Sequence, residues 1–183
     1  MQTSVDKWRF QRIDDAMPTD QRKNSLTADG APLDAVNRHL LAELLADARL
    51  TLAELGRRVG LSAPAVAERL QRLKESGVVR GYRADLDPRA LGCPMGVVLR
   101  IRPEARYLRV VADCARGSPE VVECHRITGE DCYLMKLYVR DVEHLEEVID
   151  RFTRYGQTTT SIIQSSPVPG RSLPVAVGGN APA

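Results

Sequence analysis

Arginines and small polar residues between positions 57 and 80 are the side chains of this sequence best suited to bind a nucleic acid. Guanidinium groups bind phosphate oxygens, and a bidentate pair with guanine is the commonest base-specific contact with DNA. Arg69 is the first candidate for reading a base, whereas Arg57 and Arg58 suit backbone phosphates. The predicted DNA-contacting residues are Arg57, Arg58, Ser62, Ala63, Pro64, Ala65, Glu68, Arg69, Arg72, Lys74 and Arg80.

Patterns typical of catalytic and metal sites do not occur in the sequence. His39, His125 and His144 are scattered, and no Ser/His/Asp order, glycine-rich phosphate loop or H-E-x-x-H motif accompanies them. The 4 cysteines form no C-x-x-C pair, so neither a zinc site nor a disulfide scaffold is indicated. We therefore expect reduced thiols, no cofactor and a protein that is not an enzyme.

Apolar spacing and capping residues predict the helices that carry these arginines. Leucines recurring at three- and four-residue steps predict a helix over residues 34–46, with Asp34 as its N-cap. Thr51 and Ser62 are expected to cap two further helices. The side chains of these two helices that are expected to face a core are Leu52, Leu55, Val59, Val66, Leu70 and Leu73.

Glycines separate the helices and end the group. Gly60 is expected to end the second helix in a left-handed conformation and Gly77 to end the third, while Gly56 lets two helices cross closely. A short β-strand is expected over residues 78–82. Three helices and a β-wing are typical of a winged helix-turn-helix, whose third helix enters the major groove. Any single arginine could simply lie on a solvent-exposed helix surface. The helix-turn-helix pattern around them favours DNA binding for the arginines taken together.

Alternating apolar residues further along the chain predict a second domain of mixed α and β structure. Its element order is β-α-β-β-α-β, the ferredoxin-like arrangement. Helices cover one face of such a sheet, so we expect the chain to associate with itself through the other face. In chain order the elements are expected at residues 95–101, 108–117, 121–128, 133–139, 142–152 and 158–164.

The predicted fold class is therefore α+β, with an N-terminal winged helix-turn-helix and a C-terminal ferredoxin-like βαββαβ domain. The formal net charge is +2, and all of this excess lies within residues 34–90. No apolar run approaches the ~20 residues of a membrane-spanning helix and no signal peptide is recognisable, so we expect a cytoplasmic protein without a membrane partner. The expected division is a flexible N-terminal extension (1–32), the DNA-binding domain (33–82), a linker (83–93), the ferredoxin-like domain (94–166) and a flexible tail (167–183).

Two groups of motifs, in this order, resemble the Lrp/AsnC (feast/famine) transcriptional regulators. The first is LGRRVGLS at residues 55–62, which is followed by the glycine-rich stretch at residues 77–82. The second comprises residues 122–124, Thr128-Gly129-Glu130 and Tyr133-Leu134-Met135-Lys136. The resemblance spans about residues 33–167. The two groups of motifs together are specific for this family, whereas either group alone is not.

This resemblance implies sequence-specific binding to double-stranded DNA and a C-terminal domain that responds to a small effector, usually an amino acid. It also implies dimers, commonly assembled into tetramers or octamers, with the effector bound between dimers. Glu130 or Asp131 is then expected to pair with the α-ammonium group of the effector, while backbone N–H groups bind its α-carboxylate. The effector-binding residues implied in this way are His125, Gly129, Glu130, Asp131, Gln157, Thr158, Thr159 and Thr160.

The chain departs from the family pattern at three places. Cys132 stands where an acidic residue usually precedes the aromatic residue, here Tyr133, and Gly56 stands where alanine is usual. The N-terminal extension, to about residue 32, is longer than is typical. The first departure concerns the identity of the effector and leaves the fold unchanged.

Three other interpretations remain open from the sequence. Siroheme decarboxylases look like the same two-domain fold, but they use histidines, and this chain has only 3. Cys124 and Cys132 lie on adjacent predicted strands, so a thiol-sensing regulator is a second alternative. An architectural DNA-binding protein without an effector is the third, and in that case Gly129-Glu130-Asp131 is only a solvated hairpin turn.

Overall fold

The chain folds into two compact units. The computed structural model describes residues 33–175, so the N-terminal extension expected over residues 1–32 lies outside the described residues, as do residues 176–183. One unit consists of the described residues up to Gly81 together with Val175, and the other is Tyr82–Pro174. Between residues 33 and 175 no helix is long and apolar enough to cross a membrane.

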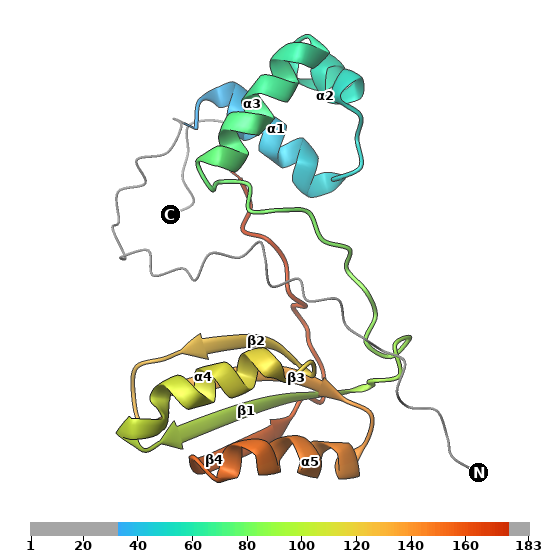
Figure 1. Ribbon diagram of the computed structural model, residues 1–183. Helices are drawn as coiled ribbons and strands as arrows, with labels where there is room; N and C mark the ends of the chain where they lie inside the picture. The colour runs from blue at the N-terminus through green and yellow to red at the C-terminus, as the bar shows by residue number, and fades with distance from the viewer. Residues whose placement is uncertain (1–32, 176–183) are drawn as a thin grey trace, which may run out of the picture. The chain divides into compact units, whose positions relative to one another are not determined.

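Three helices build the described part of the first unit: α1 (Ala35–Ala46), α2 (Leu52–Val59) and α3 (Ala63–Glu75) (Figure 1). Each begins at a side chain that accepts a hydrogen bond from a backbone N–H three residues ahead, as predicted for Asp34, Thr51 and Ser62. These caps satisfy donors that have no partner inside the helix. The buried side chains shared by the three helices are Leu40, Leu41, Leu44, Leu55, Val66, Leu70 and Leu73.

Three details of the first unit differ from the prediction. Leu52 was expected to face the core, but as the first residue of α2 it is 41% exposed. The β-strand expected at residues 78–82 is absent, because a strand needs a hydrogen-bonded neighbour and this segment has none among the described residues. Instead Val79 N–H donates to the Leu73 carbonyl at 3.0 Å, and the Val79 side chain packs on the helical core. Val175, in the stretch expected to be a flexible tail, packs on the same core.

A tight turn joins α2 to α3 and lies directly against Gly56. The Leu61 N–H donates to the Gly56 carbonyl at 2.9 Å, which brings the turn back against the body of α2. A Cβ atom at position 56 would lie 2.4 Å from the Leu61 carbonyl oxygen, closer than two such atoms can approach. Gly60 ends α2 at φ 73°, in the left-handed conformation that was predicted.

The second unit is a four-stranded antiparallel sheet with two helices, in the order β2-β3-β1-β4. Its topology is the ferredoxin-like one predicted from the element order. The elements are β1 (Met95–Pro103), a short 3-10 turn (Ala105–Tyr107), α4 (Leu108–Gly117), β2 (Val121–Arg126), β3 (Tyr133–Val139), α5 (Val142–Thr153) and β4 (Gly156–Ile162).

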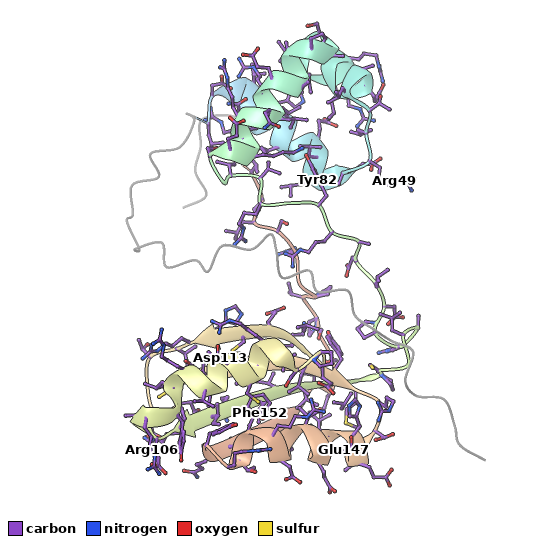
Figure 2. All side chains as sticks on the ribbon, in the orientation of Figure 1. Arg49, Tyr82, Arg106, Asp113, Glu147 and Phe152 are labelled. Atoms are coloured by element: carbon purple, nitrogen blue, oxygen red, sulfur yellow. The ribbon has the colours of Figure 1, made fainter. Side chains whose placement is uncertain are left out.

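Both helices pack on one face of this sheet, and Phe152 of α5 is fully buried there (Figures 1 and 2). The alternate residues of β1 and β3 that face the helices are Val97, Leu99, Ile101, Tyr133, Met135, Leu137 and Val139. Val142, the first residue of α5, is 54% exposed, so the buried face of the helix begins one turn later. We call the opposite side of the sheet the open face, because no element of this unit covers it.

Candidate functional site

The N-terminus of α3 is a turn of small residues with Ser62 as its N-cap. Ser62 Oγ accepts a hydrogen bond from the Ala65 N–H at 3.4 Å, and Ala63, Pro64 and Ala65 form the first turn. Their side chains are small, so another molecule can approach the backbone closely. The remaining N–H groups of a helix N-terminus favour phosphate oxygens.

Arg57 and Arg58, both on α2, converge on the carboxylate of Glu54. Arg57 binds it with Nε at 3.0 Å and Nη2 at 2.6 Å, and Arg58 binds it with Nε at 2.9 Å. Arg58 also donates from Nη1 to Glu43 on α1 at 2.7 Å. Hydrogen bonds from Arg57 and then Arg58 lower the pKa of Glu54 to about 2, so this carboxylate is ionised at neutral pH. Arg57 nevertheless remains 74% exposed and can exchange Glu54 for a phosphate.

The outer side of α3 carries the other predicted cations. Arg72 pairs with Glu68 one turn earlier, and both side chains are well exposed. Lys74, near the end of α3, and Arg80, beyond it, are exposed as well. The structure therefore places these predicted DNA-contacting side chains at the surface of the first unit, as binding to a duplex requires.

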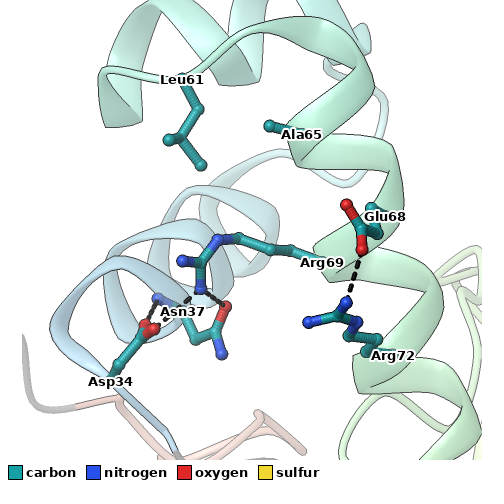
Figure 3. A pocket seen from close by; sticks show the side chains of 7 residues that line it. All are labelled: Asp34, Asn37, Leu61, Ala65, Glu68, Arg69 and Arg72. Carbon is teal, nitrogen blue, oxygen red and sulfur yellow. Dashed lines mark hydrogen bonds and ion pairs between the residues drawn. The ribbon is translucent and has the colours of Figure 1, made fainter.

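Arg69, the residue first chosen for base reading, has a different environment. Its Nη1 atom donates to Asp34 Oδ2 at 2.8 Å and to Asn37 Oδ1 at 3.0 Å, both at the start of α1. The Asn37 N–H and then Arg69 hold the pKa of Asp34 below its ordinary value. Figure 3 shows Arg69 turned toward α1 across an open pocket of about 500 Å³, whose lining includes Glu68 and Arg72.

In the second unit, the loop between β2 and β3 carries the predicted effector hairpin. Gly129 has φ 112°, a conformation that favours glycine, and Glu130 is exposed. Arg102 Nε donates to the Glu130 carbonyl at 2.9 Å, and Arg100 Nη1 lies 3.7 Å from Asp131 Oδ2. Two arginines of β1 thus stand next to the acidic residues of the hairpin.

The strand register divides the other predicted effector residues between the two faces of the sheet. His125, Leu134, Arg100 and Thr159 are paired in sequence across β2, β3, β1 and β4, so they form one row on the open face. Since adjacent strands lie about 4.8 Å apart, His125 and Thr159 are separated by roughly 14 Å.

Gln157 pairs with Arg102 and shares the open face with Thr159. Thr158 and Thr160 pair with Ile101 and Leu99, so they point to the helix side instead. The four consecutive residues of β4 therefore cannot all bind one ligand.

The histidines do not converge on a site within residues 33–175. His39 lies beside Glu43, His125 beside Glu123, and buried His144 beside Glu120. In the same part of the chain no group of three or more His, Cys, Asp or Glu residues could hold a metal ion.

The thiol-sensing alternative needs Cys124 and Cys132 to come together. All 4 cysteines are free thiols, and burial raises the pKa of Cys124. Cys124 pairs with Met135, which is three positions beyond Cys132 in the chain. This offset corresponds to roughly 10 Å along the strand, more than the ~7 Å limit for a disulfide.

Sequence reasoning missed three residues of these sites. Arg100 and Arg102 alternate with the buried residues of β1, so the period-two pattern already placed them on the open face. Their proximity to the hairpin depends on the pairing of β1 with β3, which the sequence does not specify. Glu54 lies three and four residues before Arg57 and Arg58, a helical spacing at which ion pairs form.

Comparison with known proteins gives a match for each unit. A family model described as an AsnC-type helix-turn-helix domain matches residues 33–74. A second, described as an Lrp/AsnC ligand binding domain, matches residues 96–173. Both matches are in the order that the sequence motifs indicated.

Similar whole proteins are regulators. The HTH-type transcriptional regulator LrpC of Bacillus subtilis is 31% identical over 133 residues, which cover 73% of this chain and 92% of LrpC. A feast or famine regulatory protein from M. tuberculosis, solved in complex with L-methionine, matches with a TM-score of 0.73 and 32% identity. That match covers 78% of this chain and 99% of the other.

A transcriptional regulator from Neisseria meningitidis, solved as an L-Met complex, is similar as well. It has a TM-score of 0.70 and 26% identity, and the match covers 77% of this chain and 95% of the other. None of these names describes an enzyme, which agrees with the expectation from the sequence motifs.

Proposed function

Because the chain belongs to the Lrp/AsnC family of transcriptional regulators, we propose that it binds double-stranded DNA through α3 and is regulated by an amino acid. The observation that carries this proposal is the partly exposed first turn of α3, flanked by the cationic side chains of α2 and α3. A regulator acts where the DNA is, so we place the protein in the cytoplasm.

In the proposed complex the first turn of α3 lies against the floor of the major groove. Ser62, Ala63, Pro64 and Ala65 present little bulk, and the backbone N–H groups of Ser62 and Ala63 point out of the helix start, which suits close approach to phosphates and base edges. Glu68 and Arg72, one and two turns further along, are exposed on the same helix. Lys74 and Arg80 contribute contacts with phosphates.

Contacts of Arg57 and Arg58 with phosphates compete with their ion pairs to Glu54. Exposed ion pairs are worth about 0.2–1 kcal/mol each, so a duplex can displace them. Release of ions condensed on DNA provides the driving force, and binding therefore weakens as salt rises. The Glu54 carboxylate limits the affinity of the two arginines for any polyanion.

The proposed effector site is the hairpin between β2 and β3 with the adjacent end of β1. An amino acid carries an ammonium and a carboxylate group, and the hairpin offers Asp131 beside Arg100. At 3.7 Å this pair is longer than a hydrogen bond, so a ligand can place one charged group on each partner. Two structural neighbours solved with L-methionine support an amino acid as the ligand.

We further propose that the chain works as a homo-oligomer. Val98 and Leu134 lie half-buried on the open face, and a second sheet would cover them. Two protomers related by a two-fold axis present two α3 helices to two half-sites about one helical turn apart. Tetramers or octamers of such dimers, with the effector at the dimer–dimer interface, would let the ligand alter DNA binding through assembly.

A duplex selection tests DNA binding. The full chain is incubated with a random-sequence duplex library, and recovered duplexes are measured by fluorescence anisotropy at several salt concentrations. We expect a preferred sequence, and Arg57→Ala should reduce the slope of log affinity against log salt by about 1. Arg109→Ala, which removes an exposed arginine of α4, is the matched control and should leave binding unchanged. Recovery of no preferred sequence would exclude sequence-specific binding.

A thermal-shift screen against the twenty amino acids tests the effector site. An amino acid that binds the native state raises Tm, by an amount that grows with its concentration. Asp131→Asn and Arg100→Gln should each remove that shift, whereas Glu123→Gln, an exposed change on β2, should keep it. A flat response to all twenty amino acids would favour a DNA-binding protein without such an effector.

A further inference from the structure

Arg69 lies on the helix proposed to enter DNA, but its guanidinium group is bound to another helix. Both of its hydrogen bonds leave from Nη1, one to Asp34 and the other to Asn37 (Figure 3). The side chain of Arg69 is only 33% exposed, and Asn37 is buried. These two bonds use the Nη1 atom of the guanidinium and orient the whole planar group toward α1, away from the direction in which it would read a base.

Asp34, the partner of Arg69, also caps α1. Asp34 is the N-cap of α1, and its Oδ1 atom accepts the Asn37 N–H at 2.6 Å while Oδ2 accepts Arg69. One carboxylate therefore starts α1 and holds α3. The leucines between these helices supply non-directional attraction, whereas charged hydrogen bonds have a preferred geometry. The ion pair thus defines how α3 is rotated and tilted against α1.

We propose that Arg69 is a positioning residue, which couples α3 to α1 through Asp34 and Asn37 and so presents the first turn of α3 and Arg72 to DNA. Base reading then belongs to those exposed residues and not to Arg69, contrary to the sequence-based expectation. This inference rests on the proposed DNA-binding function. It assigns to the Asp34–Arg69 pair a role in the affinity for every duplex.

The two possible roles of Arg69 predict opposite effects of one substitution. Asp34→Asn keeps an N-cap, since asparagine caps helices as well as aspartate does. It removes the negative charge and places an amide nitrogen or a neutral oxygen against Arg69. If Arg69 positions α3, this change weakens DNA binding even though it makes the protein more positive. If Arg69 reads DNA and is only restrained by Asp34, the change frees it and strengthens binding.

The experiment uses the full chain and a fluorescein-labelled duplex chosen from a random library by the wild-type protein, with a scrambled duplex beside it. Asp34→Asn and Arg69→Ala should each weaken binding to both duplexes by about tenfold, which is the effect of 1.4 kcal/mol. Arg69→Lys, which retains a charge for Asp34, should recover part of the affinity. Asp47→Asn is the matched control, because Asp47 lies at the other end of α1 and its side chain accepts the Arg49 N–H, away from α3.

Single-base substitutions in the selected duplex complete the test. Arg69→Ala should lower the affinity for all of them by the same factor, so their ranking stays that of the wild type. Two outcomes would overturn the proposal: tighter binding by Asp34→Asn than by the wild type, or a loss of discrimination at particular base pairs in Arg69→Ala.

Thermal unfolding without DNA separates failure of this proposal from failure of the proposed function. Each single variant should lower the Tm of the first unit by about 4–8 °C, and the double variant should lower it by no more than one of them. Additive losses would show that the two residues are not coupled and would contradict the proposal. If the wild-type chain selects no duplex, the DNA-binding function fails, while this coupling is still measured.

Discussion

The carboxylate of Glu120 shows how a single residue can organise its surroundings. Its side chain is 10% exposed and accepts hydrogen bonds from Arg151 Nη1 and Nη2, at 2.9 and 3.0 Å. His144 Nε2 lies 3.0 Å from the same carboxylate, and His144 Nδ1 accepts the Arg140 N–H. Because Nδ1 is an acceptor, Nε2 carries the proton and donates to Glu120. The histidine is therefore part of a structural network that holds α5 to the start of β2.

This network predicts a pH-dependent stability. Burial would raise the pKa of Glu120, but hydrogen bonds from Arg151 and His144 outweigh burial and hold the pKa below its ordinary value of 4.5. A lowered pKa in the folded state stabilises the protein above pH 4.5, and this stabilisation is lost as the pH falls through and below that value. We expect the free energy of unfolding to fall by about 1–3 kcal/mol in Glu120→Gln at pH 7, because Arg151 loses its partner.

Urea unfolding at pH 7 and pH 3.5 measures this effect. The difference between wild type and Glu120→Gln should be large at pH 7 and smaller at pH 3.5, because the stabilisation that comes from the lowered pKa of Glu120 declines below its ordinary value of 4.5. Glu123→Gln removes an exposed carboxylate of the adjacent strand and serves as the control. An equal difference at both pH values would contradict the assigned role of Glu120.

Among the elements, the helices followed the sequence closely because their signals are local. Caps at Asp34, Thr51 and Ser62 act within three residues, and the left-handed Gly60 needs no distant contact. The strand expected at residues 78–82 depends on a neighbour that local sequence does not specify. Local sequence also does not predict the close contact between Gly56 and the turn that joins α2 to α3, because this contact forms only in the folded structure.

Gly56→Ala should destabilise the first unit. Alanine favours a helix over glycine by about 1 kcal/mol, but its Cβ would meet the Leu61 carbonyl oxygen at 2.4 Å. Relief of such overlap by backbone shifts costs about 1–3 kcal/mol, so we expect a lower Tm. Gly117→Ala is the control, since that glycine ends α4 with open space around its Cβ position, and its Tm should not fall. An unchanged or higher Tm for Gly56→Ala would show that the turn can relax.

At the scale of the whole molecule, the open face of the sheet carries apolar side chains that no helix of the same unit covers. Tyr138, Lys136 and Leu134 of β3 alternate with residues of the core, and Val98 of β1 pairs with Lys136. Helices cover only the other side of the sheet. Contact with a second copy would bury these half-exposed apolar side chains.

Leu134→Glu should therefore lower the molecular mass in solution. A charge in the middle of the open face opposes contact between two sheets, but it leaves the core of its own unit intact because Leu134 points away from the helices. Light scattering coupled to size exclusion should show the mass of the wild type as a multiple of 20.2 kDa and that of the variant as a smaller multiple. Val110→Glu, an exposed change on α4, should keep the mass of the wild type. A monomeric wild type would contradict association through this face.

Residue types and their short-range spacing were enough to predict the fold class, the helices of both units, the strands of the sheet, the helix caps and the family, but the strand predicted at residues 78–82 is absent. These features depend on periodicity and on hydrogen bonds within a few residues, and both can be read along the chain. Only the tertiary structure decided that Arg69 binds Asp34, thirty-five residues away. Only strand register decided that Thr158 and Thr160 lie on the opposite side from Thr159 and that Arg100 stands beside Asp131. A side chain's partner depends on which distant segments fold together, and spacing along one segment does not contain that information.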